Sequence, residues 1–165
     1  MKNVYERVNN NLNESKRDVS FSPNLLNELD DEERMTVEEK IVYLCLNGDS
    51  TSFQFIPHLK TINIEENFTE EKINKLNPYK KALIYKELYN RYKNNIYIKN
   101  IINLSSEDIK VYSLLTIMFI NNELPIEYRD ELKNIADNSS NEMYRNMFDK
   151  RIGRLDLNYK SVRIH

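Results

Sequence analysis

Residues 105–121 restrict the possible fold more than any other segment, because their apolar side chains recur at helical spacing on two sides. A helix that is apolar on both sides has to be covered on both sides. Ser105 and Ser106 are suitable N-cap residues for such a helix, and the two acidic residues after them lie where the helix dipole favours negative charge. We therefore predict a central buried helix wrapped by shorter ones. Its two stripes consist of Ile109, Tyr112, Thr116, Phe119 and Ile120, and of Val111, Leu114, Leu115 and Met118.

Glycine and proline are scarce, with two and four in 165 residues. Folds that need glycine-rich phosphate loops or many tight hairpins are therefore disfavoured. No apolar run approaches the roughly 20 residues that a membrane-spanning helix needs, and the first residues lack the apolar core of a signal peptide. The single cysteine, Cys45, excludes an internal disulfide. The composition predicts a cytoplasmic protein with no membrane segment.

Start and stop signals divide the chain into short helices joined by polar turns. Ser22-Pro23 predicts a short helix that reaches Leu29, because proline at the first helical position costs no hydrogen bond. Thr36 and Glu39 fit a capping box that would open a helix over 37–47, and Gly48 would end it. Residues 49–68 are predicted to be a packed loop with a short helical piece, although residues 61–65 also alternate like a strand. Further helices are predicted over 69–76, 78–93, 96–104, 125–136 and 140–152.

This succession of helices predicts an all-α fold. We expect one helical domain over 21–153, after a polar N-terminal arm over 1–20 that is frayed or weakly helical, and before an extended tail over 154–165. Helix starts near residues 78, 106 and 140 are 28 and 34 residues apart. That spacing, over about residues 76–153, resembles the stacked helix pairs of HEAT-like repeats, while an irregular bundle of short antiparallel helices fits nearly as well.

Charge is distributed unevenly along the chain. Residues 1–75 hold 15 acidic against 9 basic residues, whereas residues 76–165 hold 11 against 15. The densest acidic run extends from Glu28 to Glu39, with Arg34 as its one basic residue. Such a run is commonly a solvated surface; the sharper interpretation is a docking face for a basic partner, because complementary fields speed association. The candidate partner-binding residues are Glu28, Asp30, Asp31, Glu32, Glu33, Glu38 and Glu39.

The residues of the common catalytic and metal-binding motifs are missing. With glycines only at Gly48 and Gly153, neither a dinucleotide-binding nor a Walker loop can be written, and two histidines with one cysteine make a zinc site improbable. Cys45 lies among apolar residues and is predicted to be buried, and His58 is predicted to be a loop histidine. Neighbouring carboxylates such as Glu70 and Glu71 point to different faces of a helix. We predict a protein that is not an enzyme and needs no metal or other cofactor.

Lysines and tyrosines alternate over residues 79–93, as on surfaces that bind nucleic acid. Tyr85, Tyr89 and Tyr92 fall on the core stripe of the predicted helix, however, so core tyrosines with a rim of lysines are the better interpretation. The overall charge of −2 also disfavours a nucleic-acid partner. A basic group near the C-terminus keeps open the alternative of a nucleic-acid-associated regulator: Lys150, Arg151, Arg154, Lys160 and Arg163.

In size, acidic run and helical pattern the chain resembles several families of small bacterial toxin-immunity proteins, including those of contact-dependent inhibition systems. The resemblance is of general type, so it assigns no role to any residue. It implies a binding module that neutralises a basic toxin, often a nuclease, by occupying its surface.

The predicted central helix can be tested by shortening one of its side chains. Replacing Leu115 by alanine should lower the free energy of unfolding by roughly 2–5 kcal/mol, because a leucine covered on both sides leaves a cavity. Chemical denaturation measures this loss. A loss well under ~1 kcal/mol would place the segment at the surface.

Overall fold

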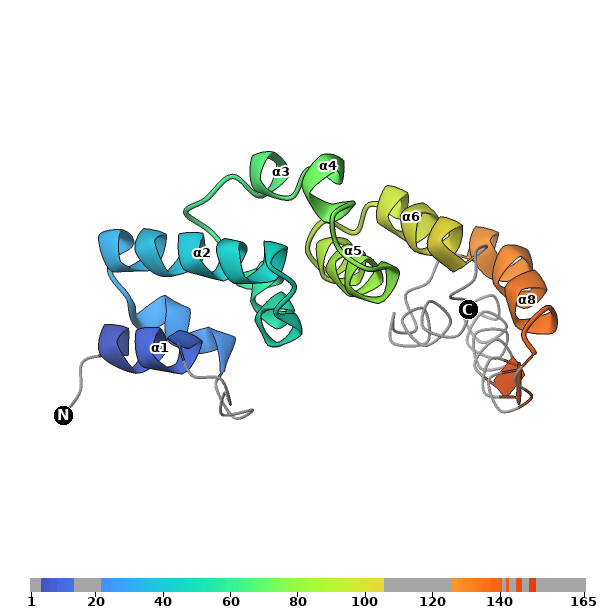
Figure 1. Ribbon diagram of the computed structural model, residues 1–165, viewed down its shortest axis with the longest axis horizontal. Helices are drawn as coiled ribbons and strands as arrows, with labels where there is room; N and C mark the ends of the chain where they lie inside the picture. Colours follow the sequence, from blue (N-terminus) through green and yellow to red (C-terminus); the bar gives the residue numbers. More distant parts are fainter. Residues whose placement is uncertain are drawn as a thin grey trace, which may run out of the picture. The chain divides into compact units, whose positions relative to one another are not determined.

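The computed structural model describes residues 4–13, 22–105 and 126–140, with single positions at 142, 145, 146, 149 and 150. The fold is all-α, as predicted, and the described residues form α-helices and 3-10 helices without a β-strand (Figure 1). The chain divides into two compact units, Met1–Lys93 and Asn94–His165. Within the described ranges, no helix combines the length and the hydropathy that a membrane crossing needs.

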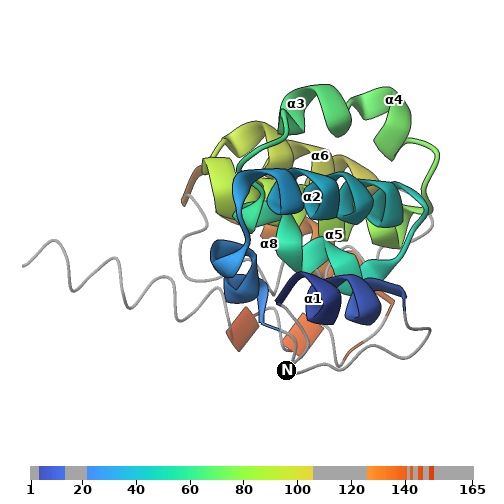
Figure 2. The same cartoon turned by 90° about the vertical axis from the view of Figure 1, so that its left-hand side faces the viewer.

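The first unit is built around a 3-10 segment, η2, which packs against both α2 and α5. The shorter elements α1 and η1 pack against each other, α1 packs against α2, and η1 packs against η2. In both overall views α1 lies below α2, and α3 and α4 lie above it (Figures 1 and 2). The elements of this unit are α1 (Val4–Asn13), η1 (Pro23–Glu28), α2 (Asp31–Leu46), η2 (Ser50–His58), α3 (Ile64–Asn67), α4 (Glu70–Ile73) and α5 (Pro78–Tyr92).

The core of the first unit forms where the apolar faces of these helices meet η2. Burying an aliphatic or aromatic side chain of this size contributes about 1.5–3 kcal/mol, so the set supplies the main driving force for folding. Its buried residues include Leu26 and Leu29 around η1, Val37, Ile41, Val42 and Cys45 from α2, Phe53, Phe55 and Ile56 from η2, and Ala82, Ile84, Tyr85, Leu88 and Tyr89 from α5.

Helix α2 begins six residues earlier than the sequence predicted. Asp30 is its N-cap, and the Asp30 carboxylate accepts a hydrogen bond from the Glu33 amide at 2.8 Å. The predicted capping box at Thr36 is therefore wrong: the Thr36 hydroxyl donates to the Glu32 carbonyl inside the helix. The physical reason is that aspartate caps at least as well as threonine, and the acidic residues after Asp30 are further stabilised by the helix dipole.

Residues 49–68 are more helical than the predicted packed loop with one short helical piece, because they contain both η2 and α3, and residues 61–65 form no strand. Asp49 caps η2, and its carboxylate accepts hydrogen bonds from the Thr51 amide and from the hydroxyls of Thr51 and Ser52. Pro57 lies inside η2, one residue before its end, and has no N–H to donate to the preceding turn. Residues 64–67 then form the single turn of α3.

The N-terminal segment contains a helix over residues 4–13, which is one of its two predicted states. Val8 and Leu12 of α1 are buried. The Lys40 ammonium of α2 donates to the side-chain oxygens of Asn9 at 2.5 Å and Asn13 at 2.6 Å. These contacts attach α1 to α2.

Helix α5 begins and ends where the sequence predicted. Asn77 caps it, Pro78 is its first residue, and Lys93 at its C-cap has the left-handed φ of 52°. The predicted core position of Tyr92 is wrong, because this side chain is 39% exposed. Tyr92 lies in the last turn, and the Arg91 guanidinium stands over its ring.

The described part of the second unit consists of α6 (Asn95–Ser105), η3 (Ile126–Tyr128) and α8 (Arg129–Asp137). Ile98 and Ile101 of α6 are buried, as is Tyr128. The Asn95 side-chain amide donates to the Glu127 carboxylate at 2.9 Å, which ties the start of α6 to η3.

Several predictions for the second unit fall beyond the described positions. Ser105 is the last residue of α6, and the helix that Ser105 and Ser106 are predicted to cap lies outside the described residues. Residues 106–125, which carry the rest of the predicted central helix, lie outside the described residues, as does the tail over 154–165. Of the helix predicted over 140–152, positions 142, 145, 146, 149 and 150 are described and helical.

Gly48, two residues after the end of α2, allows a test of backbone strain. Its φ of +83° lies in the left-handed region, so Gly48→Ala should lower the free energy of unfolding by about 1 kcal/mol. An added Cβ would lie 2.7 Å from the Lys80 Nζ, but that flexible end can move. Denaturation of Gly48→Ala with and without Lys80→Ala separates the two causes. If the second substitution restores the lost stability, the cause is the steric contact and not the backbone.

Candidate functional site

The acidic run Glu28–Glu39 lies on the end of η1 and the first half of α2, and its members differ in exposure. Glu38 is completely buried, with 0% of its surface exposed. Glu33 is partly buried. The remaining five residues face solvent: Glu28, Asp30, Asp31, Glu32 and Glu39.

Helix capping and the helix dipole explain part of this acidic run. Asp30 is occupied as the N-cap of α2, and Asp31, Glu32 and Glu33 form its first turn. Negative side chains in the first turn stabilise a helix by typically 0.3–1 kcal/mol each, because the unpaired amides there carry partial positive charge. The acidic residues therefore hold the start of α2 in place and at the same time present their carboxylates to solvent.

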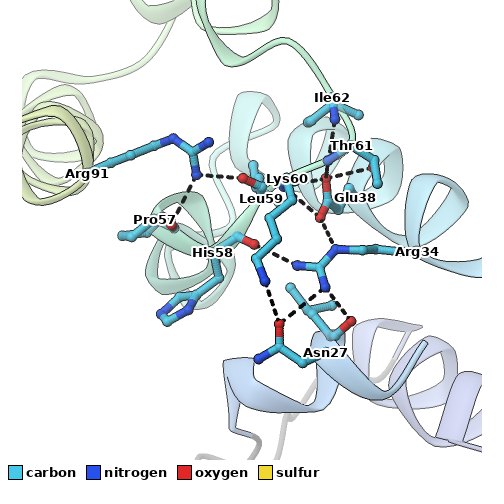
Figure 3. A network of polar contacts seen from close by, with 11 residues as sticks. Asn27, Arg34, Glu38, Pro57, His58, Leu59, Lys60, Thr61, Ile62 and Arg91 are labelled. Carbon is cyan, nitrogen blue, oxygen red and sulfur yellow. Dashed lines mark hydrogen bonds and ion pairs between the residues drawn. The ribbon is translucent and has the colours of Figure 1, made fainter. Parts of the chain in front are cut away.

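Glu38 binds the loop that follows η2 (Figure 3). Its Oε2 accepts hydrogen bonds from the amides of Lys60 at 2.9 Å, Thr61 at 2.7 Å and Ile62 at 3.3 Å, and from the Thr61 hydroxyl at 2.8 Å. Successive amides that converge on one oxygen form a small anion-binding nest. A carboxylate of α2 thus replaces the backbone partners that this non-helical loop lacks.

Arg34, one turn before Glu38, completes this network. Its Nε donates to the Glu38 Oε1 at 2.7 Å, and its two terminal nitrogens reach the Leu26 carbonyl at 2.7 Å and the His58 carbonyl at 2.9 Å. Arg34 is only 6% exposed, so the pair is an internal ion pair in which both charges are also hydrogen-bonded. We call Arg34, Glu38 and the loop 58–62 the clamp.

From α5, Arg91 reinforces the same loop. Its guanidinium donates to the carbonyls of Pro57 at 3.0 Å and of Leu59 (Figure 3). Among the described residues, no buried side-chain nitrogen or oxygen lacks a hydrogen-bond partner. The clamp and Arg91 together therefore join η1, α2, the end of η2 and α5 through satisfied polar groups.

The electrostatics of Glu38 follow from these contacts. Burial alone would raise the pKa of its carboxyl group, but the Lys60 amide, the hydroxyl and amide of Thr61 and the Arg34 side chain all favour the charged form. The net effect lowers the pKa of Glu38 from its ordinary value of 4.5. Glu38 is therefore ionised at neutral pH, and its charge is used inside the molecule.

The solvent-facing side of α2 carries two large apolar residues that were not predicted from the sequence. Met35 is 46% exposed and Tyr43 is 67% exposed. They lie on the same side of the helix as Glu32 and Glu39, because the four residues are spaced three, four and four apart. We call Glu32, Met35, Glu39 and Tyr43 the α2 face.

Cys45 and His58, the other two candidate residues, differ in exposure. Cys45 is completely buried, as predicted, and His58 is the last residue of η2, with its side chain exposed. In the described part of the chain, no group of three or more histidine, cysteine, aspartate or glutamate residues could hold a metal ion.

The basic and aromatic segment of α5 divides as the sequence predicted for Tyr85 and Tyr89, which are buried. Burial, followed by the negative charge of Glu70, raises the pKa of Tyr85, so this phenol stays neutral at physiological pH. The Lys86 ammonium lies 2.7 Å from the Glu87 carboxylate, and Arg91 is engaged with backbone carbonyls. Part of the positive charge of α5 is therefore already compensated within the unit.

Comparison with protein-family models, with curated proteins and with solved structures finds no match to this chain.

The clamp can be tested by removing the charge of Glu38 without changing its shape. In Glu38→Gln an amide NH₂ would face donors in place of a carboxylate oxygen, so the free energy of unfolding at pH 7 should fall by about 3 kcal/mol. The matched control is Glu39→Gln, its exposed neighbour, which should change the same quantity by less than ~0.5 kcal/mol. Equal effects of the two substitutions in urea denaturation would contradict the clamp.

The same two variants should also differ in how their folding stability depends on pH. The folded-state pKa of Glu38 is lowered, so its contribution to stability is complete above its ordinary value of 4.5 and is lost as pH falls below it. Stability measured between pH 6 and the acid limit should therefore fall less steeply in Glu38→Gln than in the unmodified protein and in Glu39→Gln. Parallel curves would mean that Glu38 carries no such linkage.

Proposed function

We propose that this protein is a non-catalytic binding module that neutralises a basic protein partner by occupying its surface. In its most specific form the partner is a toxin domain, such as a nuclease, and the chain acts as an immunity or antitoxin protein. The observation that carries the proposal is the solvent-facing acidic surface made by Glu28, Asp30, Asp31, Glu32 and Glu39.

Two properties of this surface support binding. First, within the described part of the chain no ion pair joins Glu28, Asp31, Glu32 or Glu39 to a basic side chain, so these charges are available to a partner. Second, α2 is held by the clamp on its buried side and capped by Asp30. A rigid charged surface loses little conformational freedom on association, and complementary charge speeds the encounter.

The alternative function is a nucleic-acid-associated regulator that uses the basic C-terminal half. Lys150 is described and exposed, whereas Arg151, Arg154, Lys160 and Arg163 lie outside the described residues. A protein of this second class would be retained by nucleic acid at low salt and released steeply as salt rises. The acidic surface favours the first class, because it repels phosphates and attracts cations.

Charge reversal tests the proposed function. Glu32→Lys with Glu39→Lys should weaken capture of the partner from the native host about tenfold or more, because attraction becomes repulsion at two positions of the acidic surface. The matched control is Glu65→Lys with Glu66→Lys, which alters the net charge equally at two exposed carboxylates of α3. Isothermal titration with the captured partner measures both.

If the control weakens binding as much as the α2 variant does, net charge and not this surface is responsible. If the unmodified protein captures no basic protein but shifts nucleic acid at low salt, the alternative function replaces the proposed one. Neutralisation is checked by co-expression, in which the α2 variant should fail to protect cells that the control protects.

A further inference from the structure

The α2 face has the pattern of one side of a helix–helix contact. Its four residues recur at intervals of three, four and four, and all are exposed on a 16-residue helix. This is the spacing of the seam along which two helices pack. Met35 and Tyr43 are eight residues apart, which places them about 12 Å apart along the axis.

The chemistry of the face resembles the centre of an interface more than that of an ordinary solvated helix. Tyrosine and methionine are enriched in interfaces, and buried tyrosines are frequent hot spots. Tyr43 is the most exposed large apolar side chain among the described residues, at 67%. Its ring stands on the outer side of the same helix whose inner side carries the clamp, so the backbone beneath it is fixed.

The negative charge of the α2 face determines which kind of partner can bind there. Glu32 and Glu39 lie on it, Asp31 lies at its N-terminal end, and no basic residue of α2 shares it. Arg34 is buried in the clamp, and Lys40 reaches sideways to Asn9 and Asn13 of α1. In a dimer of this chain the carboxylates of the two α2 faces would repel each other, and the same charges would repel nucleic acid or an anionic membrane.

We propose that the α2 face receives a basic amphipathic helix of the protein partner. Two apolar side chains of that helix, seven or eight residues apart, contact Met35 and Tyr43. Lysine or arginine residues beside them pair with Glu32 and Glu39, in the manner of an amphipathic helix that binds through regularly spaced anchors. The inference rests on the proposed function and adds the part of the partner that is recognised.

Synthetic peptides of about 18 residues serve as the probe. The first contains lysine, alanine and leucine, with leucines at every third and fourth position so that they form one stripe. The second has the same composition with the leucines spread around the helix, and the third has glutamate in place of lysine. Titration into the full chain, with backbone amide NMR shifts as the readout, should show binding of the first peptide and shifts centred on residues 32–43.

Variants then separate the contributions to binding. Met35→Ala with Tyr43→Ala should weaken binding of the first peptide about tenfold, as expected for loss of an interface centre. Tyr79→Ala is the matched control, since Tyr79 is 40% exposed on α5, and it should leave the dissociation constant within about twofold. Glu32→Lys with Glu39→Lys should weaken binding and reduce its dependence on salt.

Three results would overturn the inference: equal binding of the first and second peptides, unchanged binding by Met35→Ala with Tyr43→Ala, or a concentration-dependent dimer in sedimentation that those two substitutions abolish. The last would make a second copy the occupant. Failure is distinguishable from failure of the proposed function. If binding of a captured partner is weakened by charge reversal but not by loss of Met35 and Tyr43, the proposed function stands and only the inference of a bound helix is wrong. If the first peptide binds specifically but no partner is captured, the inference about the α2 face stands and only the proposed function is wrong.

Discussion

The buried pair of Arg34 and Glu38 is the interaction on which the first unit depends. An ion pair inside a protein is costly unless both charges find further hydrogen bonds. Here both do: Glu38 receives three consecutive amides and a hydroxyl, and Arg34 reaches two carbonyls in segments before and after α2. The pair thereby satisfies backbone groups that no helix or sheet would satisfy, and it fixes the path of the chain out of η2.

The two sides of α2 consequently have different roles. The inner side carries the clamp and the apolar residues that pack on η2, so its charge is internal. The outer side carries carboxylates and exposed apolar side chains that make no such network. A helix held on one side by buried polar contacts can present the other without local rearrangement, and a preorganised surface loses less entropy on binding.

The sequence was sufficient for the all-α fold, for the helix starts at Pro23 and Pro78 and for the burial of Cys45, because these depend on local periodicity and on helix start signals. It was insufficient for the acidic run. Glu28 to Glu39 reads as one charged stretch, yet Glu38 is buried, because its amide partners lie more than twenty residues away and no local pattern reports them. Arg34 and Glu38 are spaced as an i,i+4 pair, but spacing alone does not reveal burial.

The choice of N-cap links stability to recognition. If α2 began at Val37, as the capping box at Thr36 predicted, then Glu32 and Met35 would precede the helix and share no face with Tyr43. Because Asp30 caps the helix instead, the additional turns extend the exposed stripe by Glu32 and Met35 and bring Arg34 one turn before Glu38. The same capping bond that starts α2 therefore assembles both the internal ion pair and the outer face, so a substitution that removes the Asp30 cap acts on the two together.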